Sequence, residues 1–470
     1  MDVPRTPSVL AVMHFASAGL GDARRSKRLV RLAERIFKHP GGSLPDKLPK
    51  RSDLVAFYRL MDCPKVTHRS VIQPHLQHTR EAIAACGGVV LLIHDDTELD
   101  YTTHLSVEED LGSVGNGGGR GYICHNTLAV TEDRCVLGLA EQILHKRRDV
   151  PEGESPRRKR DHPARQSLLW LAGCESTNDL QQEGRTLVDI ADRAGDTFEF
   201  LEYEQRHNRR YVIRVARDRN LAGDDHVGDD RIYHKLFELT RDLPSLGQRQ
   251  VPIASSTKKK GKARVATVRL ASAPVSIARP HFARGHCTLE SIDASVIHVC
   301  EVDPPPGVQP IEWLLLTNLP CQSLEQARRC VDFYECRPII EDYHKGMKTG
   351  CGIELPQMET IDRLEPTIAI LSVVAAVLLQ LRELARHKSR GDRPARSIVP
   401  PRWVELLSLN HYGQKRELSV KEFCLLLAAL GGHQNRKSDG LPGWLTLWRG
   451  WTAFHLILQG AELATGWRSV

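Results

Sequence analysis

Five consecutive apolar residues at 89–93 follow two glycines and lead into the acidic pair Asp95 and Asp96. An uninterrupted apolar run of this length is typical of a strand buried on both faces, in a sheet that helices cover on both sides. Further strand-like runs and helical patterns then follow along the chain. The strand-like runs lie at 126–131, 135–143, 186–190 and 211–216, and the helical patterns near 166–172 and 197–205. The sequence therefore predicts an α/β fold.

The chain is long enough for more than one domain. Its 470 residues are about three times the ~150 of a typical domain, so two or three domains are expected. The segment at about 218–310 alternates in polarity and predicts a β-rich insertion, with a basic hairpin loop at 258–264, and the chain is mostly helical from Ser323 onward. The expected domains are a helical domain at 1–88, an α/β domain with its insertion at 89–375, and a helical domain at 376–470.

The basic residues are concentrated at the N-terminus. Residues 1–88 hold 15 Lys and Arg against 7 Asp and Glu, a balance of 15 − 7 = +8, whereas the whole chain carries +7. Asp22 predicts the start of a helix that runs to about Phe37. The face of this helix opposite its apolar side carries Arg24, Arg28, Arg31 and Arg35. Such a stripe is either a solvated surface or a set of phosphate contacts, and the scarcity of acidic neighbours favours a nucleic acid partner. A second basic stretch at 146–165 predicts an exposed loop or a DNA-facing arm.

Several other classes of protein are disfavoured. The twelve cysteines are scattered singly, without the spacing of a zinc site, which predicts free thiols in a reducing cytoplasm. The most apolar segment, 367–381, is shorter than the ~20 residues that span a bilayer, so we expect a buried central helix and no membrane association. The glycine-rich segment 115–121 lacks the rest of a nucleotide-binding loop, so it predicts a flexible hairpin loop and no nucleotide cofactor.

Two aspartates directly follow predicted strands. Asp95 follows the strand at 89–94, and Asp192 follows the strand at 186–190. Carboxylates at the C-terminal ends of neighbouring strands can converge, and with a third they can hold two divalent cations for phosphoryl transfer. Aspartates at strand ends also serve as turn and capping residues, so this pair alone is weak evidence.

A third pattern is more specific. Tyr334, Arg337, Glu341 and Lys348 lie at offsets 0, 3, 7 and 14, which on a helix fall within an arc of about 60°. An acid, two cations and a phenol on one face suit a phosphate-binding edge beside a metal ligand, although an exposed charged face has the same appearance. We expect Pro338 either to kink this helix or to mark its first turn.

These residues resemble a known family. The pattern Tyr-x2-Arg-x3-Glu-x6-Lys resembles the signature of the bacterial insertion-sequence DDE transposases of family four, the group that contains the Tn-five transposase. The segment IHDDTELDY resembles the first-aspartate motif and aligns Asp95, not Asp96, with the metal ligand, and IADRAGD resembles the second-aspartate motif with Asp192 and Arg193. The resemblance extends from about residue 15 to 465 and includes EWLLLTNLP with Trp313, GDARRSKRLVRLA at the N-terminus and GGHQNRKSDGLPGWLTLWRGW near the C-terminus.

The resemblance implies a fold and a mechanism. It implies an RNase H-like catalytic core with a β-rich insertion, an N-terminal helical DNA-binding domain and a C-terminal helical dimerisation domain. Two Mg2+ ions, with Mn2+ as a substitute, would be held by the catalytic residues Asp95, Asp192 and Glu341. Its partner would be double-stranded DNA, namely the terminal inverted repeats of the element and the target DNA. The protein would act as a homodimer in the bacterial cytoplasm and would be associated with the nucleoid when bound to DNA. The DNA contacts would be Tyr334, Arg337, Lys348, Arg193, the N-terminal arginines, and Trp313 against an extruded base.

Three functions are compatible with these patterns. The leading interpretation is a cut-and-paste transposase that cleaves transposon ends and transfers the strands to target DNA. A catalytically inactive, transposase-derived DNA-binding repressor or inhibitor is the alternative, and retention of all three carboxylates argues against it. The third interpretation is a stand-alone two-metal nuclease, but it does not explain why the chain has a basic N-terminal region and a long C-terminal part.

Overall fold

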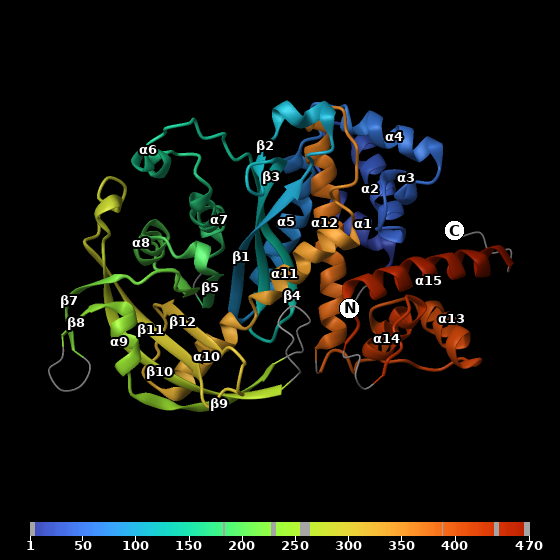
Figure 1. Cartoon of the computed structure of the whole chain (residues 1–470). Coiled ribbons are helices and arrows are strands. Elements are labelled where there is room, and N and C mark those ends of the chain that lie inside the picture. The colour runs from blue at the N-terminus through green and yellow to red at the C-terminus, as the bar shows by residue number, and fades with distance from the viewer. Residues whose placement is uncertain are drawn as a thin grey trace.

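Within the residues that the structure describes, twelve strands form one mixed sheet, and helices pack against it (Figure 1). The computed structural model describes residues 5–181, 184–226, 232–253, 264–387, 389–436 and 441–464. The central strands follow the order β4-β3-β1-β5-β6, in which β1 pairs antiparallel with β3 and parallel with β5. Their bounds are β1 Gly88–Asp100, β2 Gly112–Val114, β3 Gly119–Thr131, β4 Val136–His145, β5 Arg185–Ala191 and β6 Arg210–Arg214. This confirms the α/β interpretation and the four later strand-like runs.

The first strand is longer than its apolar run predicts. β1 does not end at His94 but continues to Asp100, because β3 pairs with it as far as the Asp100–Gly121 position. The parallel partner β5 stops earlier, where Ala191 lies opposite His94. Asp95 therefore lies inside a strand, at the point where the parallel pairing ends, and the expectation that it directly follows the strand is wrong.

Helices connect the central strands. The predicted helices appear as α7 Leu169–Ser176, after a short 3-10 turn, and α8 Phe198–Arg206. The basic stretch 146–165 is largely exposed, as expected, but it contains a short helix, α6 Pro156–Asp161. The glycine-rich segment lies in a hairpin, as predicted: residues 115–118 form the turn between β2 and β3, and residues 119–121 begin β3.

The β-rich insertion extends the same sheet. β12 pairs antiparallel with β6, so the added strands continue outward from the core in the order β12-β11-β10-β7-β8. The elements are β7 Asn220–His226, β8 Ile232–Lys235, α9 Leu236–Asp242, β9 Ser245–Ile253, β10 Arg264–Ala278, β11 Ser291–Glu301 and β12 Glu312–Thr317. The predicted basic loop at 258–264 lies outside the described residues except for Arg264, which pairs with Ile253 where β10 meets β9.

The N-terminal residues are helical, as predicted. The helices are α1 Pro7–Phe15, α2 Ala23–Lys38, α3 Leu44–Lys47, α4 Arg51–Met61 and α5 His68–Ala85. Asp22 caps α2, because its carboxylate accepts the backbone N–H of Arg24 at 2.8 Å. The apolar face of α2 is fully buried and consists of Leu29, Leu32, Ala33, Ile36 and Phe37.

The C-terminal part is helical around one long buried helix. The helices are α10 Leu324–Tyr334, α11 Pro338–Lys345, α12 Ile361–Arg386, α13 Pro401–Tyr412, α14 Val420–Leu430 and α15 Trp444–Ala464. Among the described residues, α12 alone is long and apolar enough to cross a membrane, and 83% of its most apolar stretch is buried inside the protein. This confirms the buried central helix. Helix α12 packs against α5, α4 and α2, and the expected boundary at 375/376 falls within it.

The cysteines agree with the sequence interpretation. All twelve are free thiols, and eight of them are buried.

Candidate active site

Asp95 and Asp192 lie side by side at the end of the parallel strand pair. Because His94 lies opposite Ala191, the next residues, Asp95 and Asp192, continue the two strands at the same level. Residues at matching positions of parallel strands point to the same face of the sheet. Asp192 directly follows Ala191, the last residue of β5, and its carboxylate accepts the N–H of Ala194 at 2.8 Å, so it caps the short turn Arg193–Gly195.

Asp96 points to the opposite face of β1 and has other partners. Its Oδ1 lies 2.6 Å from Nδ1 of His125, and its Oδ2 accepts the amide N–H of Gln166 at 3.0 Å. Both oxygens therefore have hydrogen-bond partners on the face away from Asp192. This geometry favours Asp95 over Asp96 as the residue that works together with Asp192.

Glu341 is joined to Asp95 through Arg337. The Nη2 of Arg337 lies 2.8 Å from Oε1 of Glu341 and 3.7 Å from Oδ2 of Asp95. The Glu341 side chain is 48% exposed, whereas Asp95 and Arg337 are each 14% exposed. One guanidinium therefore lies between a partly buried and a solvent-facing carboxylate, where the local charge favours a cation.

The carboxyl group of Asp95 is electrostatically unfavourable in its ionised form. The pKa of Asp95 is raised to about 7, chiefly by burial and also by the neighbouring Asp192, while Arg337 lowers it in part. A second neighbour is His344, whose Nδ1 lies 3.9 Å from Oδ2 of Asp95. Burial lowers the pKa of His344 to about 3, so its ring is neutral. A buried carboxylate without full compensation is the environment in which a metal cation gains most.

Sequence reasoning missed His344. It follows Glu341 by three residues and so shares its face of α11. Its Nε2 lies 3.1 Å from Nδ2 of Asn126, whose amide oxygen in turn accepts an N–H of Gln142 at 2.7 Å. Only these tertiary contacts distinguish it from an ordinary helical histidine, although the i+3 spacing from Glu341 was visible in the sequence.

The predicted single helical stripe is broken into three pieces. Tyr334 is the last residue of α10, Pro338 is the first residue of α11, and Lys348 lies in the π-helical turn Gly346–Gly350. Of the two expectations for Pro338, a kink or a first turn, the second is confirmed, because Pro338 begins α11. Its missing N–H has no cost there, since the first N–H groups of a helix have no partner within the helix. The Nζ of Lys348 lies 3.1 Å from Glu354, so its nearest carboxylate is not one of the three predicted ligands.

Tyr334 and Trp313 form a pair beside the carboxylates. Their ring centroids are 5.8 Å apart in an edge-to-face arrangement. Tyr334 is buried, and burial raises its pKa, opposed by Arg337 and Arg214 and reinforced by Asp192. Trp313 lies on β12 and is partly exposed, while Arg193 is exposed in the turn after Asp192.

The four N-terminal arginines lie elsewhere, on α2. Arg24 and Arg28 are exposed and have no ion pair within the described residues. Arg31 and Arg35 are 3.6 and 3.8 Å from the carboxylate of Asp53, which is buried on α4. Two of the four arginines are therefore partly engaged within the protein, and two face solvent.

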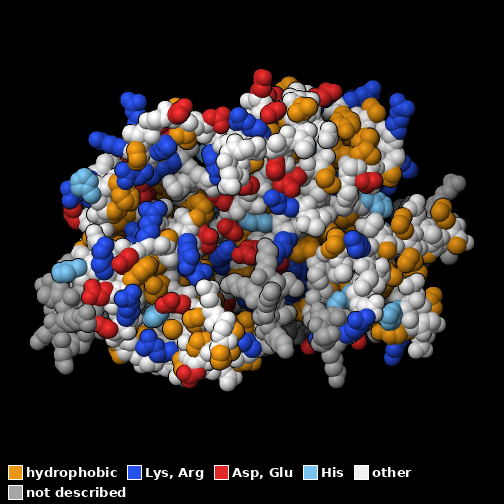
Figure 2. All heavy atoms as spheres, in the orientation of Figure 1, with side chains coloured by type: hydrophobic (Ala, Val, Ile, Leu, Met, Phe, Trp, Pro, Cys, Tyr) orange, Lys and Arg blue, Asp and Glu red, His pale blue; other side chains and the backbone are white. Residues whose placement is uncertain are grey.

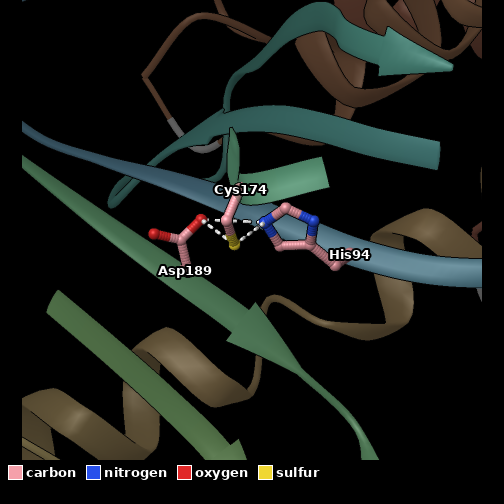
Figure 3. Close-up of side chains that lie close together, drawn as sticks. All are labelled: His94, Cys174 and Asp189. Carbon is pink, nitrogen blue, oxygen red and sulfur yellow. Dashed lines mark hydrogen bonds and ion pairs between the residues drawn. The ribbon is translucent and has the colours of Figure 1, made fainter. Parts of the chain in front are cut away.

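A buried cluster of His94, Cys174 and Asp189 lies on the other face of the sheet (Figure 3). The Nε2 of His94 is 2.8 Å from Oδ1 of Asp189, and the Sγ of Cys174 is 3.6 Å from the same oxygen. These atom types can ligate a metal ion. However, Arg209 donates from Nη2 and Nε to Oδ2 of Asp189 at 2.7 and 3.0 Å, and all four side chains are fully buried. We therefore describe the cluster as a hydrogen-bonded ion pair, in which His94 is a packed core residue.

The N-terminal helices have known relatives. Residues 11–66, from within α1 to the end of the loop between α4 and α5, match the family model described as transposase DNA-binding. All four predicted arginines of α2 lie within this match. It supports a transposase with DNA as its partner.

Proposed function

We propose that the protein is a DNA transposase that cuts the ends of its element and joins them to target DNA. The observation that carries the proposal is the placement of Asp95 and Asp192 where the parallel pairing of β1 and β5 ends, with Glu341 joined to Asp95 through Arg337. The family match at residues 11–66 supports the DNA binding that this function requires. The central strand order, with antiparallel strands on one side of β1 and parallel strands on the other, supports the RNase H-like core implied by the family-four resemblance.

The chain's own residues have separate roles in this proposal. Asp95, Asp192 and Glu341 would hold two Mg2+ ions, because they are carboxylate ligands around a partly buried position that disfavours uncompensated negative charge. Bound Mg2+ would activate the attacking oxygen and stabilise the leaving oxygen. Arg337 can bind a phosphate bidentately, and Trp313, which packs edge-to-face on the buried Tyr334, would meet the DNA beside it. Lys348, which now lies 3.1 Å from Glu354, would bind a further phosphate. The exposed arginines of α2 would bind phosphates away from the cleavage point.

The direct test is cleavage of a labelled DNA fragment. The probe is a duplex carrying the inverted repeats that bracket the reading frame, incubated with the protein and Mg2+. We expect a nick at the repeat boundary followed by joining to a second duplex. Binding without any end-specific cut would instead support the inactive, transposase-derived binding protein.

Paired substitutions sharpen this test. Glu341→Gln and Asp95→Asn should each abolish cleavage and leave DNA binding nearly unchanged. Asp96→Asn is the matched control, since Asp96 lies next in the chain but faces His125 and Gln166. If Asp96→Asn abolished cleavage and Asp95→Asn did not, the assignment of the metal ligands would be wrong.

A further inference from the structure

A basic pocket lies between α6, the start of α8 and the strands β7, β8 and β10. Its volume is about 290 Å3. Five cations and three acids line it: Arg160, Arg165, Arg217, Arg219 and Lys235, against Asp196, Glu199 and Asp218. Figure 2 shows Lys and Arg side chains gathered over the part of this face where α6, α8 and β8 lie in Figure 1.

The acids of the pocket are already engaged. Arg165 lies 2.6 Å from Glu199, and Arg219 pairs with Asp196. Asp218 accepts the backbone N–H of Phe237 at 2.9 Å. The exposed Arg217 and Lys235 have no ion pair among the residues that the structure describes. The pocket therefore presents positive charge that its own acids do not neutralise, which favours a polyanionic ligand.

An exposed aromatic ring lies in the same pocket. Phe282 is 39% exposed, and the guanidinium of Arg160 lies 5.1 Å from its ring centroid. A cation stacked on an exposed ring, surrounded by further cations, is typical of surfaces that follow a nucleic acid strand, because the ring packs on bases or sugars while the cations meet phosphates.

The position of the pocket relates it to the carboxylates. Asp196 in its wall follows Asp192 by four residues, so their Cα atoms are at most ~14 Å apart. One step along a DNA strand advances about 3.4 Å along the duplex. The pocket therefore begins within roughly four nucleotide steps of a phosphate held at Asp192.

We propose that this pocket binds the backbone of the DNA strand that leaves the carboxylate site, within a few nucleotides of the cleaved phosphate. The proposal rests on the proposed function for the identity of that phosphate. Arg217 and Lys235 make the phosphate contacts, and Arg160 with Phe282 holds the adjoining sugar or base.

The test measures how DNA binding depends on salt. The probe is the duplex with the terminal repeat and its flanking DNA, and binding is measured in EDTA so that cleavage plays no part. Each lost phosphate contact lowers the slope of log K against log salt by about 0.9, so Arg217→Ala/Lys235→Ala should lower it by up to about 1.8. The matched control is Lys421→Ala/Arg449→Ala, which removes two exposed cations from the C-terminal helices and should leave the slope unchanged.

Neutral linkages in the DNA test the same contacts from the side of the nucleic acid. Methylphosphonates placed within four nucleotides of the cut should weaken binding of the wild-type protein and have little further effect on the double variant. An unchanged slope in the double variant, or an equal effect of methylphosphonates on both proteins, would overturn the proposal. If the salt slopes change as expected but the protein never cleaves DNA, the proposed function would be contradicted, whereas the role of the pocket in binding the DNA backbone would still be supported.

Discussion

Replacement of Asp95 by Asn should stabilise the metal-free protein at alkaline pH. The pKa of Asp95 lies at about 7, against an ordinary value of 3.8. At about 1.36 kcal/mol per pKa unit, ionisation of Asp95 costs the folded protein about 4 kcal/mol, as an order of magnitude. Between pH 4 and 7 the folded state binds more protons at this carboxyl than the unfolded state, so stability falls as the pH rises through that window. Asn carries no charge and avoids this loss.

The assay is urea unfolding of both proteins at pH 4.5 and pH 8 in EDTA. We expect Asp95→Asn to be more stable than the wild type by up to about 4 kcal/mol at pH 8 and by much less at the lower pH. Added Mg2+ should stabilise the wild type at pH 8 and have little effect on the variant, since a ligand that binds only the folded state raises its stability. An equal difference at both pH values, or the same gain in the Asp96→Asn control, would refute the reasoning.

Two further predictions concern stability alone. Arg209→Leu should lower the free energy of unfolding by about 3–5 kcal/mol, because it leaves the fully buried carboxylate of Asp189 without its cation; urea unfolding measures this, and a loss below about 1 kcal/mol would contradict it. Gly450→Ala should destabilise the protein by about 1–3 kcal/mol or more, because a Cβ there would lie 1.7 Å from the backbone oxygen of Leu427. Gly460→Ala on the same helix is its control, since no atom lies within 4 Å; it should be neutral or stabilising by up to about 1 kcal/mol, and equal losses in the two variants would show that the contact is unimportant.

Local patterns predicted those elements whose ends are determined by nearby residues. Asp22 identified the start of α2 because its carboxylate caps the next turn, and the periodicity of α2 identified its buried face. Asp192 directly follows β5, as expected, and its carboxylate caps the next short turn by accepting the N–H of Ala194. These features depend on hydrogen bonds within a few residues of one another or on a simple apolar repeat.

Features that depend on distant partners were not predicted. The length of β1 is set by β3, whose Gly121 lies opposite Asp100. Helical periodicity treats 334–348 as one continuous helix, but the carbonyl of Tyr334 accepts the N–H of Arg337 at 3.0 Å, and a new helix then begins at Pro338. Strand geometry predicts that Asp95 and Asp96 point to opposite faces. Their partners come from four separate segments of the chain, so local patterns cannot predict them: His125, Gln166, Asp192, and Arg337 with His344.

The placement of α12 has a consequence for synthesis of the chain. The apolar face of α2, completed at Phe37, belongs to the same core cluster as α12, and the indole N–H of Trp451 donates to the carbonyl of Phe37 at 2.8 Å. Between Phe37 and the first residue of α12 lie 361 − 37 = 324 residues of chain growth. At about 5–20 residues per second, the N-terminal helices emerge from the ribosome roughly 16–65 s before the helix that completes their core. During that interval α1 and α4 can already cover much of the apolar face of α2, because both pack against it, but the part of the core that α12 contributes is still missing.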